Sequence, residues 1–557
     1  MKLLRIRWTV LLASSAFVLT GCGGGSSTAE LAVAPATGQQ QEPEQASPSG
    51  PNCLFNATSA YCQNAASGLP YVIYTSRSDG AADVAVNSDV VAVFSESLDP
   101  TSVSNASLTV TGDDRSAVQG TVEYDASRNA LVFRHTQDLT GRRYTATVAS
   151  NVKDAAGNMM GRPYSWSFSV DPTRRDTDVQ KNLQQILDKA AYTYKIPGSL
   201  IAIRDDQGRT WATSNGYADL TTRTPIKTNM HFRMGSNTKT YVGTVILQLA
   251  DAGKLGLDDP VNKYIGAEMS AYLPAYDGNR ITVRQLLNHT SGIANFTSDG
   301  GWGNAFISEP FKQYFPQELL LIANGHASDA TAPQFGKFAY SNTNYVLLGL
   351  IIRKASGMTY EDAVPSAITI TQGLGGTLIP RLGDATIPAP LSRGYWEDAE
   401  TGTFHDVTLR DSSTVWASGN MISTIGDLAK WGELLGKGSL LSSGMQGQRL
   451  QFVPMSDNLS YGLGIVKDNG ANLLGHQGGM IGYTSQTYYM PDTGYTLAFF
   501  YNRTLALHDY SAVMTYDAIR ALWPSRPAAA VKPSARRLAS PPAETEQIRK
   551  PGFLMEY

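Results

Sequence analysis

A serine and a lysine three positions apart carry the clearest chemical signal in the 557-residue chain. Ser236 and Lys239 lie in the run MGSNTK, directly before an apolar helical pattern that includes Val242, Val245 and Leu249. Side chains three positions apart on a helix project from the same side, one turn apart. A lysine placed there can ease formation of an alkoxide, or can take the hydroxyl proton if burial depresses its own pKa. The sequence therefore predicts a nucleophile and its activator.

The spacing by itself is weak support, because the chain contains a second copy of it. Ser150 and Lys153 have the same separation, but no helical pattern follows them. We interpret this copy as chance. A helix start after Ser236 matters because its N-terminus adds a favourable potential at a nucleophile.

A tyrosine and an asparagine form the second candidate element. Tyr340 and Asn342 lie in FAYSNTNYVLLGLII, before another helical pattern. The phenol could act as a general base and later as an acid, and the amide could bind both Lys239 and a substrate carbonyl. The alternative is a tyrosine that simply begins a helix. Ser456–Asn458 matches a related three-residue pattern, but it leads into a strand and is interpreted as a loop.

A histidine followed by glycines forms the third element, which we expect between two strands. It consists of His476, Gln477, Gly478 and Gly479. The histidine would face the nucleophile, and the glycine backbone would let a substrate lie alongside the strand. A backbone N–H here, paired with that of Ser236, would form an oxyanion hole. Taken alone, without its neighbours, the histidine is better explained as a structural residue.

Composition and missing motifs exclude several other functions. The 45 basic and 48 acidic residues are balanced, which argues against nucleic acid as a partner. None of the seven histidines belongs to a His-x-x-x-His array, so no metal site is predicted. The G-x-S-x-G motif of ordinary α/β-hydrolases is absent from the sequence. No cofactor is implied.

The periodicity of apolar residues, which indicates strands or helices, changes along the chain. Residues 70–172 alternate in short runs separated by turn residues, which predicts an all-β sandwich. Both ends of residues 177–523 contain a helical pattern and strand patterns, and the stretch between them is mostly helical in pattern. This arrangement predicts an α+β domain with a helical insertion. The expected strands are 90–94, 108–110, 121–124, 131–133, 144–148, 164–170, 199–203, 209–214, 461–466, 483–490 and 495–501. The expected helices include one that is capped by Asp176 or Thr177 and has an apolar face over residues 183–191, and two further helices at 281–287 and 507–523.

The two ends of the chain have the composition of targeting and linking segments. Residues 1–21 have a basic start and a short apolar run, and with Cys22 they resemble a bacterial lipoprotein signal. We therefore expect lipid on Cys22, a flexible tether over residues 22–69, and a membrane-anchored protein facing the periplasm or the cell exterior. Cys53 and Cys62 could form a disulfide or remain free thiols. The Pro-, Ala- and Arg-rich tail, 524–557, is expected to be disordered.

Two family resemblances follow from longer stretches of sequence. The segments VAVFSESLDP, VKDAAGN and WSFSV resemble those of a bacterial Ig-like module. Residues 180–523 resemble the penicillin-recognising serine hydrolases, in the branch that holds class C β-lactamases, D-alanyl-D-alanine carboxypeptidases and related esterases. The resemblance rests on FRMGSNTKTYVGTVILQLADAGKLGLDDPVNKYI, ITVRQLLNHTSGI, YSNTNYVLLGLIIRKASGMTYED, ASGNMISTIGDLAKW, YGLGIVKD and GHQGGMIGY, which occur in this order.

The resemblance to the hydrolases implies a mechanism for the three elements. Ser236 would attack a carbonyl and become acylated, Lys239 would activate it, and Tyr340 would carry the proton to the leaving group. Asn342 would hold the amide of the acyl side chain, and the N–H groups of Ser236 and Gly479 would stabilise the oxyanion, at about 3–4 kcal/mol for each donor. His289, in NHTSG, is interpreted as a residue that orders its loop.

Two departures from the family pattern bear on the substrate. The third motif more often begins with lysine, and a neutral His476 binds an anionic carboxylate less reliably. Lys467 stands where enzymes that cleave a terminal D-alanine carry an arginine, and it offers a point charge in place of a bidentate fork.

The expected function is a serine hydrolase of the D-alanyl-D-alanine carboxypeptidase type that acts on cell-wall stem peptides. A β-lactamase or an esterase for small esters is the alternative within the family. A surface-tethered binding protein without turnover is the alternative of another class. The sequence gives no oligomeric state.

Overall fold

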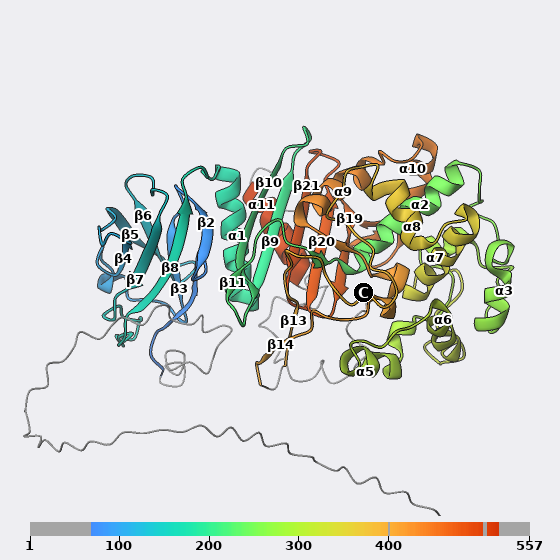
Figure 1. Cartoon of the computed structure of the whole chain (residues 1–557), viewed down its shortest axis with the longest axis horizontal. Coiled ribbons are helices and arrows are strands. Elements are labelled where there is room, and N and C mark those ends of the chain that lie inside the picture. Colours follow the sequence, from blue (N-terminus) through green and yellow to red (C-terminus); the bar gives the residue numbers. More distant parts are fainter. Residues whose placement is uncertain (1–67, 399–400, 505–509, 523–557) are drawn as a thin grey trace, which may run out of the picture. The chain divides into compact units, whose positions relative to one another are not determined.

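The computed structural model describes residues 68–398, 401–504 and 510–522 (Figure 1). The predicted signal peptide, the lipid on Cys22, the pairing of Cys53 with Cys62 and the tail all fall outside these residues. So does the predicted tether, apart from its last two residues. These expectations stay predictions. Within the described residues, no helix is both long enough and apolar enough to cross a membrane.

The N-terminal domain is a sandwich of two four-stranded sheets, ordered β1-β3-β6-β5 and β2-β8-β7-β4. In β8 the residues Tyr164, Trp166, Phe168 and Val170 are buried and alternate with half-exposed residues, as the period of two predicts. Two strands, β1 and β2, were not predicted. The eight strands are β1 Val72–Thr75, β2 Ala81–Ala85, β3 Val90–Phe94, β4 Leu108–Gly112, β5 Gly120–Asp125, β6 Ala130–His135, β7 Arg143–Val148 and β8 Tyr164–Asp171.

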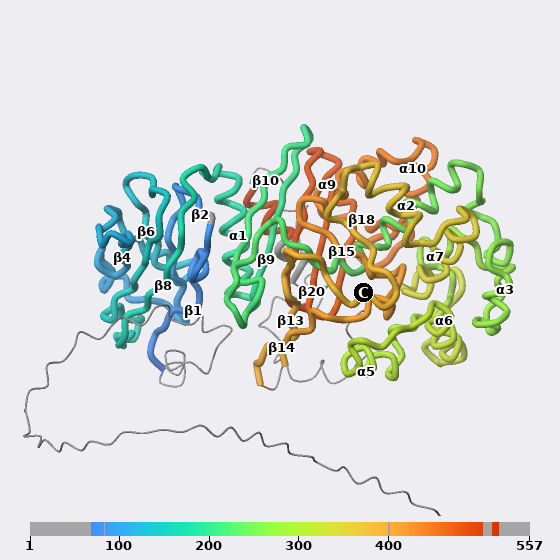
Figure 2. The backbone as a smooth tube through the Cα atoms, in the orientation of Figure 1, coloured from blue at the N-terminus to red at the C-terminus, as the bar shows by residue number. Residues whose placement is uncertain are grey.

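The second domain is built on a nine-stranded antiparallel sheet, ordered β11-β10-β9-β21-β20-β19-β18-β17-β16. The central strands come from both ends of the domain, because residues 199–204 of β9 pair with all of β21. Figure 2 shows this mixing as green strands beside red ones. The strands are β9 Gly198–Arg204, β10 Thr210–Asp219, β11 Thr224–Pro225, β16 Val453–Pro454, β17 Leu459–Tyr461, β18 Val466–Asp468, β19 Leu473–Met480, β20 Tyr483–Tyr489 and β21 Thr496–Tyr501.

Both faces of this sheet are buried, and alternate residues of β9 serve the two sides. Ile201 and Ile203 pack in one apolar cluster with α1 (Asp178–Tyr194) and α11 (Tyr510–Leu522). Leu200 and Ala202 belong to the larger cluster on the opposite face. The helix α1 begins at a capping box in which Thr177 and Gln180 satisfy each other's backbone N–H groups.

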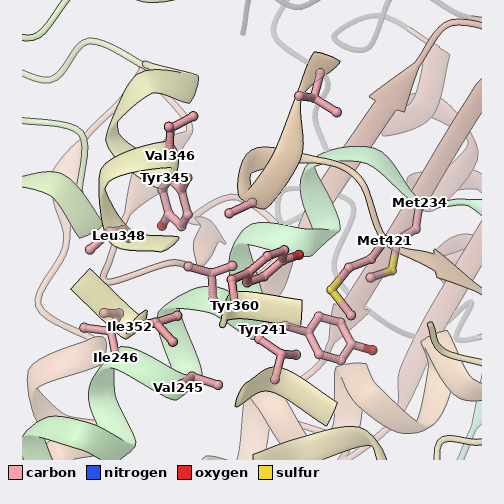
Figure 3. Close-up of a cluster of buried hydrophobic side chains, with 14 of the residues drawn as sticks. Met234, Tyr241, Val245, Ile246, Tyr345, Val346, Leu348, Ile352, Tyr360 and Met421 are labelled. Carbon is pink, nitrogen blue, oxygen red and sulfur yellow. The ribbon is translucent and has the colours of Figure 1, made fainter. Parts of the chain in front are cut away.

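The larger cluster fills the space between the sheet and the helical region (Figure 3). Met234, Tyr241, Tyr345, Tyr360 and Met421 are among its buried side chains. The helices are α2 Thr238–Asp251, α3 Asn262–Tyr272, α4 Val283–Leu287, α5 Gly300–Ser308, α6 Pro316–Gly325, α7 Asn342–Ser356, α8 Tyr360–Val364, α9 Ile425–Lys437 and α10 Ser443–Arg449, and the short pairs of strands are β12 Phe232–Arg233 with β15 Ile422–Ser423 and β13 Tyr395–Glu397 with β14 Phe404–Asp406.

The strand predicted over residues 461–466 is wrong, because the structure has two strands there. The chain turns between β17 and β18, and the N–H of Gly462 donates to the carbonyl of Ile465. Gly464 has a φ of +74°, a conformation that glycine adopts readily. A Cβ at Gly464 would lie 3.3 Å from the carbonyl oxygen of Lys239, so the turn passes directly over α2.

Candidate active site

The predicted nucleophile and its lysine are in contact. Ser236 lies in a short 3-10 turn, η3 (Gly235–Asn237), and Lys239 lies in the first turn of α2. The Oγ of Ser236 is 2.9 Å from the Nζ of Lys239, and both residues are buried. Two hydrogen bonds of 2.8 Å hold η3 against the sheet: Asn237 donates to the Oγ of Ser485, and Ser485 donates to the carbonyl of Met234.

Lys239 is surrounded by acceptors. Its Nζ is 2.7 Å from the Oδ1 of Asn342 and 2.7 Å from the carbonyl oxygen of Ser418. These two oxygens can only accept hydrogen bonds. A neutral amine has two N–H groups, so satisfying both oxygens leaves its lone pair for the hydroxyl of Ser236. Burial lowers the pKa of Lys239 well below its usual value, which favours this neutral amine.

Tyr340 lies beside the lysine, two residues before α7. The Nζ of Lys239 is 4.9 Å from the centroid of its ring. Asn342, the first residue of α7, is fixed by two neighbours: its N–H donates to the Oδ1 of Asn295 at 3.0 Å, and its side-chain amide donates to the Oγ1 of Thr297 at 3.1 Å. The structure therefore brings the second element to the first. The part of Asn342 in holding a substrate amide stays a prediction.

The third element lies within a strand, not between two strands as expected. His476–Gly479 belongs to β19, which pairs with β20 as far as Met480, whereas β18 stops opposite Gly475. Beyond that point η3 packs against β19. A Cβ at Gly478 would lie 1.9 Å from the carbonyl oxygen of Met234, and a Cβ at Gly235 would lie 2.7 Å from the nitrogen of Gly479. The glycines therefore permit the close approach, which places Ser236 next to this strand.

His476 is a buried, neutral acceptor for a tyrosine. Its Nδ1 contacts the carbonyl oxygen of Gln477, which can only accept, so Nδ1 carries the proton. The other ring nitrogen, Nε2, is then the acceptor, and the hydroxyl of Tyr461 lies 2.9 Å from it. Burial lowers the pKa of His476 to about 3. An imidazole in this state brings no positive charge to a substrate.

Lys467 lies on the same face of the sheet as His476, opposite a residue two positions before His476 in β19. It pairs with Leu474, which shares a face with His476 because side chains alternate along a strand. Its Nζ lies 5.6 Å from the centroid of the Phe452 ring. Gln477 is half-buried and uses its backbone carbonyl to hold His476. The suggested roles of Lys467 and Gln477 in binding substrate stay predictions.

The low pKa of His476 predicts a loss of stability in acid. In the unfolded chain a histidine has a pKa near 6.5, so between about pH 6.5 and pH 3 the unfolded state binds more protons than the native state. The free energy of unfolding should therefore fall by roughly 1.4 kcal/mol for each pH unit on account of this residue. Urea titrations at pH 6, 5 and 4 should show a shallower fall for His476→Asn. His405→Gln, at an exposed histidine, is the control, and equal slopes in His476→Asn and the wild type would contradict the prediction.

Several residues of the site were not predicted. Ser418 contributes a backbone carbonyl, Thr297 orients Asn342, and Tyr461 supports His476. A carbonyl oxygen leaves no trace in residue type, so Ser418 could be suspected only from the family-like run ASGNMISTIGDLAKW around it. His289 was predicted to order its loop, and the structure in addition places the centroid of its ring 4.3 Å from that of Tyr340.

Comparisons with known proteins identify the families of both domains. Residues 179–520 match the β-lactamase family, and residues 67–170 match the bacterial Ig-like domain family. Penicillin-binding protein 4* of Bacillus subtilis is 28% identical over 339 residues, which cover 58% of this chain and 72% of that protein. These matches confirm the predicted fold class of both domains.

Two solved structures of amide-cleaving enzymes are also similar. A D-stereospecific amidohydrolase from Streptomyces has 31% sequence identity and a TM-score of 0.55, and the match covers 63% of this chain and 100% of that one. The D-amino acid amidase of Ochrobactrum anthropi, in complex with L-phenylalanine amide, has 26% identity, a TM-score of 0.55 and the same coverage. The β-lactamase match extends over more than half of the chain. The chain therefore belongs to the β-lactamase family of serine hydrolases, joined to an N-terminal bacterial Ig-like domain.

Proposed function

We propose that the chain hydrolyses amide bonds that follow a D-amino acid residue, through an ester on Ser236. The observation that carries the proposal is the position of the Lys239 Nζ, 2.9 Å from the Oγ of Ser236 and 2.7 Å from each of the oxygens of Asn342 and Ser418. The similarity to a D-stereospecific amidohydrolase and to a D-amino acid amidase supports the D-aminoacyl part.

The proposed reaction has two steps, acylation of Ser236 and hydrolysis of the ester, and both use the same side chains. Lys239 takes the proton of Ser236 as the oxygen attacks the carbonyl carbon, and the resulting ammonium has three acceptors around it. The N–H groups of Ser236 and Gly479 stabilise the oxyanion. The proton passes through Tyr340 to the leaving nitrogen as the C–N bond breaks. Water then attacks the ester by the reverse path, releasing the acid and restoring Ser236.

We propose that the preferred leaving group is uncharged. His476 stands where a lysine is more common, yet both of its ring nitrogens are engaged within the protein and burial keeps it neutral. A substrate carboxylate would therefore meet no charge from this side chain. An amide or an ester needs no such charge, so D-amino acid amides fit this site better than peptides with a terminal carboxylate.

The D-alanyl-D-alanine carboxypeptidase expected from the sequence is the second candidate. Lys467, on the same face as His476, is the observation that favours it, together with the likeness to penicillin-binding protein 4*. Its ammonium would have to leave the Phe452 ring to reach a substrate carboxylate.

The two candidates are separated by their products. Purified full-length protein is incubated with D-alanine amide, L-alanine amide or acetylated Lys-D-Ala-D-Ala, and released ammonia and D-alanine are measured. We expect ammonia from the D-amide at least tenfold faster than D-alanine from the peptide. If the peptide releases D-alanine faster than the D-amide releases ammonia, and Lys467→Met loses this release, the carboxypeptidase is established. Failure to turn over any of the three would overturn both candidates.

A further inference from the structure

We infer that His289 is a positioning residue that sets the place of Tyr340, the proposed proton carrier. The inference rests on the proposed acyl transfer, but its geometric basis is independent of the substrate. His289 lies just after α4 and is completely buried. It contacts the catalytic segment through its backbone, its ring nitrogen and its ring face.

Two hydrogen bonds from His289 bracket the tyrosine in sequence. The carbonyl oxygen of His289 accepts the N–H of Ala339 at 2.9 Å. Its Nδ1 accepts the N–H of Ser341 at 3.2 Å. The residues before and after Tyr340 are therefore both held by one residue of another loop, so the backbone that carries the phenol has little room to move.

The protonation of His289 is fixed by its partners. Asn344 also donates to Nδ1, at 3.2 Å, and its amide orientation is set because its oxygen accepts the hydroxyl of Ser291 at 2.7 Å. With two donors facing Nδ1, that nitrogen must carry the lone pair, so the proton of the neutral ring lies on Nε2. Burial lowers the pKa of His289 well below its usual value. The acceptor therefore persists at neutral pH.

The ring of His289 also packs on the phenol. The two ring centroids are 4.3 Å apart with the planes tilted by 34°. Tyr461 meets the imidazole edge-to-face at 4.7 Å, and it is the same Tyr461 whose hydroxyl lies against His476. His289 thus joins the second and third elements of the site through direct contacts.

The backbone conformation of His289 decides which substitutions this turn can accept. Its φ is +59°, in the left-handed region, where asparagine, aspartate and histidine are enriched among residues other than glycine. A glycine would suit the turn better, but it would provide neither the acceptor nor the ring.

Two substitutions at this position tolerate the same backbone and differ in the acceptor. In His289→Asn the amide oxygen replaces Nδ1, because both atoms are bonded to Cγ. His289→Gly leaves the N–H of Ser341 and the amide of Asn344 without this acceptor. Both substitutions remove the ring, and asparagine and glycine both adopt positive φ. The difference between the two variants therefore reports mainly on the hydrogen bonds.

The test compares substrates that do and do not need a proton on the leaving group. With D-alanine p-nitroanilide, we expect His289→Gly to lower kcat about 100-fold with little change in KM, and His289→Asn to remain within about tenfold of the wild type, as expected for a loss of general acid–base assistance. With D-alanine p-nitrophenyl ester, whose leaving group departs without protonation, the acylation burst should slow less than fivefold in both variants. Equal losses on both substrates would indicate a merely structural role and would overturn the inference.

Two controls keep the inference separate from the proposed function. Tyr340→Phe should also lose more activity on the anilide than on the ester. If it does not, the proton-carrying role of Tyr340 is contradicted, and with it the proposed function. Amide hydrogen exchange of the segment around Ser341 needs no turnover: exchange should be faster in His289→Gly and close to wild type in His289→Asn. Unchanged exchange in both variants would overturn the inference even in a protein that hydrolyses none of these substrates.

Discussion

Replacing Ser236 with alanine is expected to abolish turnover, with kcat lower by about 10⁴- to 10⁶-fold, the size of effect seen when a serine nucleophile is removed. The change deletes one oxygen from η3. It leaves the hydrogen bonds of Asn237 and Ser485 in place, so the turn should keep its position. Lys239 retains the acceptors of Asn342 and Ser418. A loss of activity would therefore report on the chemistry and not on the fold.

The measurement is intact mass after incubation with D-alanine p-nitrophenyl ester or benzylpenicillin, together with the rate of ester hydrolysis. The wild type should gain the mass of an acyl group, and Ser236→Ala should not. The chain supplies a matched control, because Ser150 has the same spacing to a lysine in the Ig-like domain. Ser150→Ala should behave as the wild type. An adduct on Ser236→Ala, or hydrolysis above a hundredth of the wild-type rate, would show that another residue is the nucleophile.

The three chemical elements and their order could be predicted because each is a local pattern. Ser236 and Lys239 are one helical turn apart, and Tyr340 directly precedes a helix whose apolar face is evident in sequence. The contact between these elements, separated by about a hundred residues, came from family resemblance and not from the spacing. Strand alternation predicted β8 well, since one face of that strand is buried and the other is half-exposed.

The failures of sequence reasoning involve contacts that residue type does not encode. The run from Tyr461 to Val466 looks like one strand, but Gly464 must pass over α2 and turns the chain. His476 was expected between two strands, yet Gly478 lies inside β19, where the absence of a side chain lets Met234 approach it closely. The carbonyl of Ser418 and the left-handed backbone of His289 are tertiary features with no pattern of their own.

Replacing Lys239 with methionine is expected to lower kcat/KM by about 10³- to 10⁴-fold, at the upper end of the range for a lost general base. Methionine is of similar length and apolar, so it fills the space but cannot take the proton of Ser236. The wild-type activity should also fall in acid. As the pH drops through the folded pKa of Lys239, which burial lowers, the amine takes up a proton and its lone pair is lost. Profiles of kcat/KM from pH 4 to 9 should show this decrease toward low pH in the wild type and not in Lys239→Met.

The effect of Lys239→Met on stability should be small beside its effect on rate, because two contributions oppose each other. The oxygens of Asn342 and Ser418 lose their donor, at about 1–3 kcal/mol for each buried acceptor. Against this, the wild type must hold a buried amine in its neutral form, whereas the unfolded chain binds a proton there, and methionine removes that penalty. We expect the free energy of unfolding to change by less than about 2 kcal/mol. Lys153→Met, at the copy of the spacing in the Ig-like domain, should leave kcat/KM unchanged. If Lys239→Met kept a tenth of the wild-type activity, the base would have to be another group, and Tyr340 would be the residue to test next.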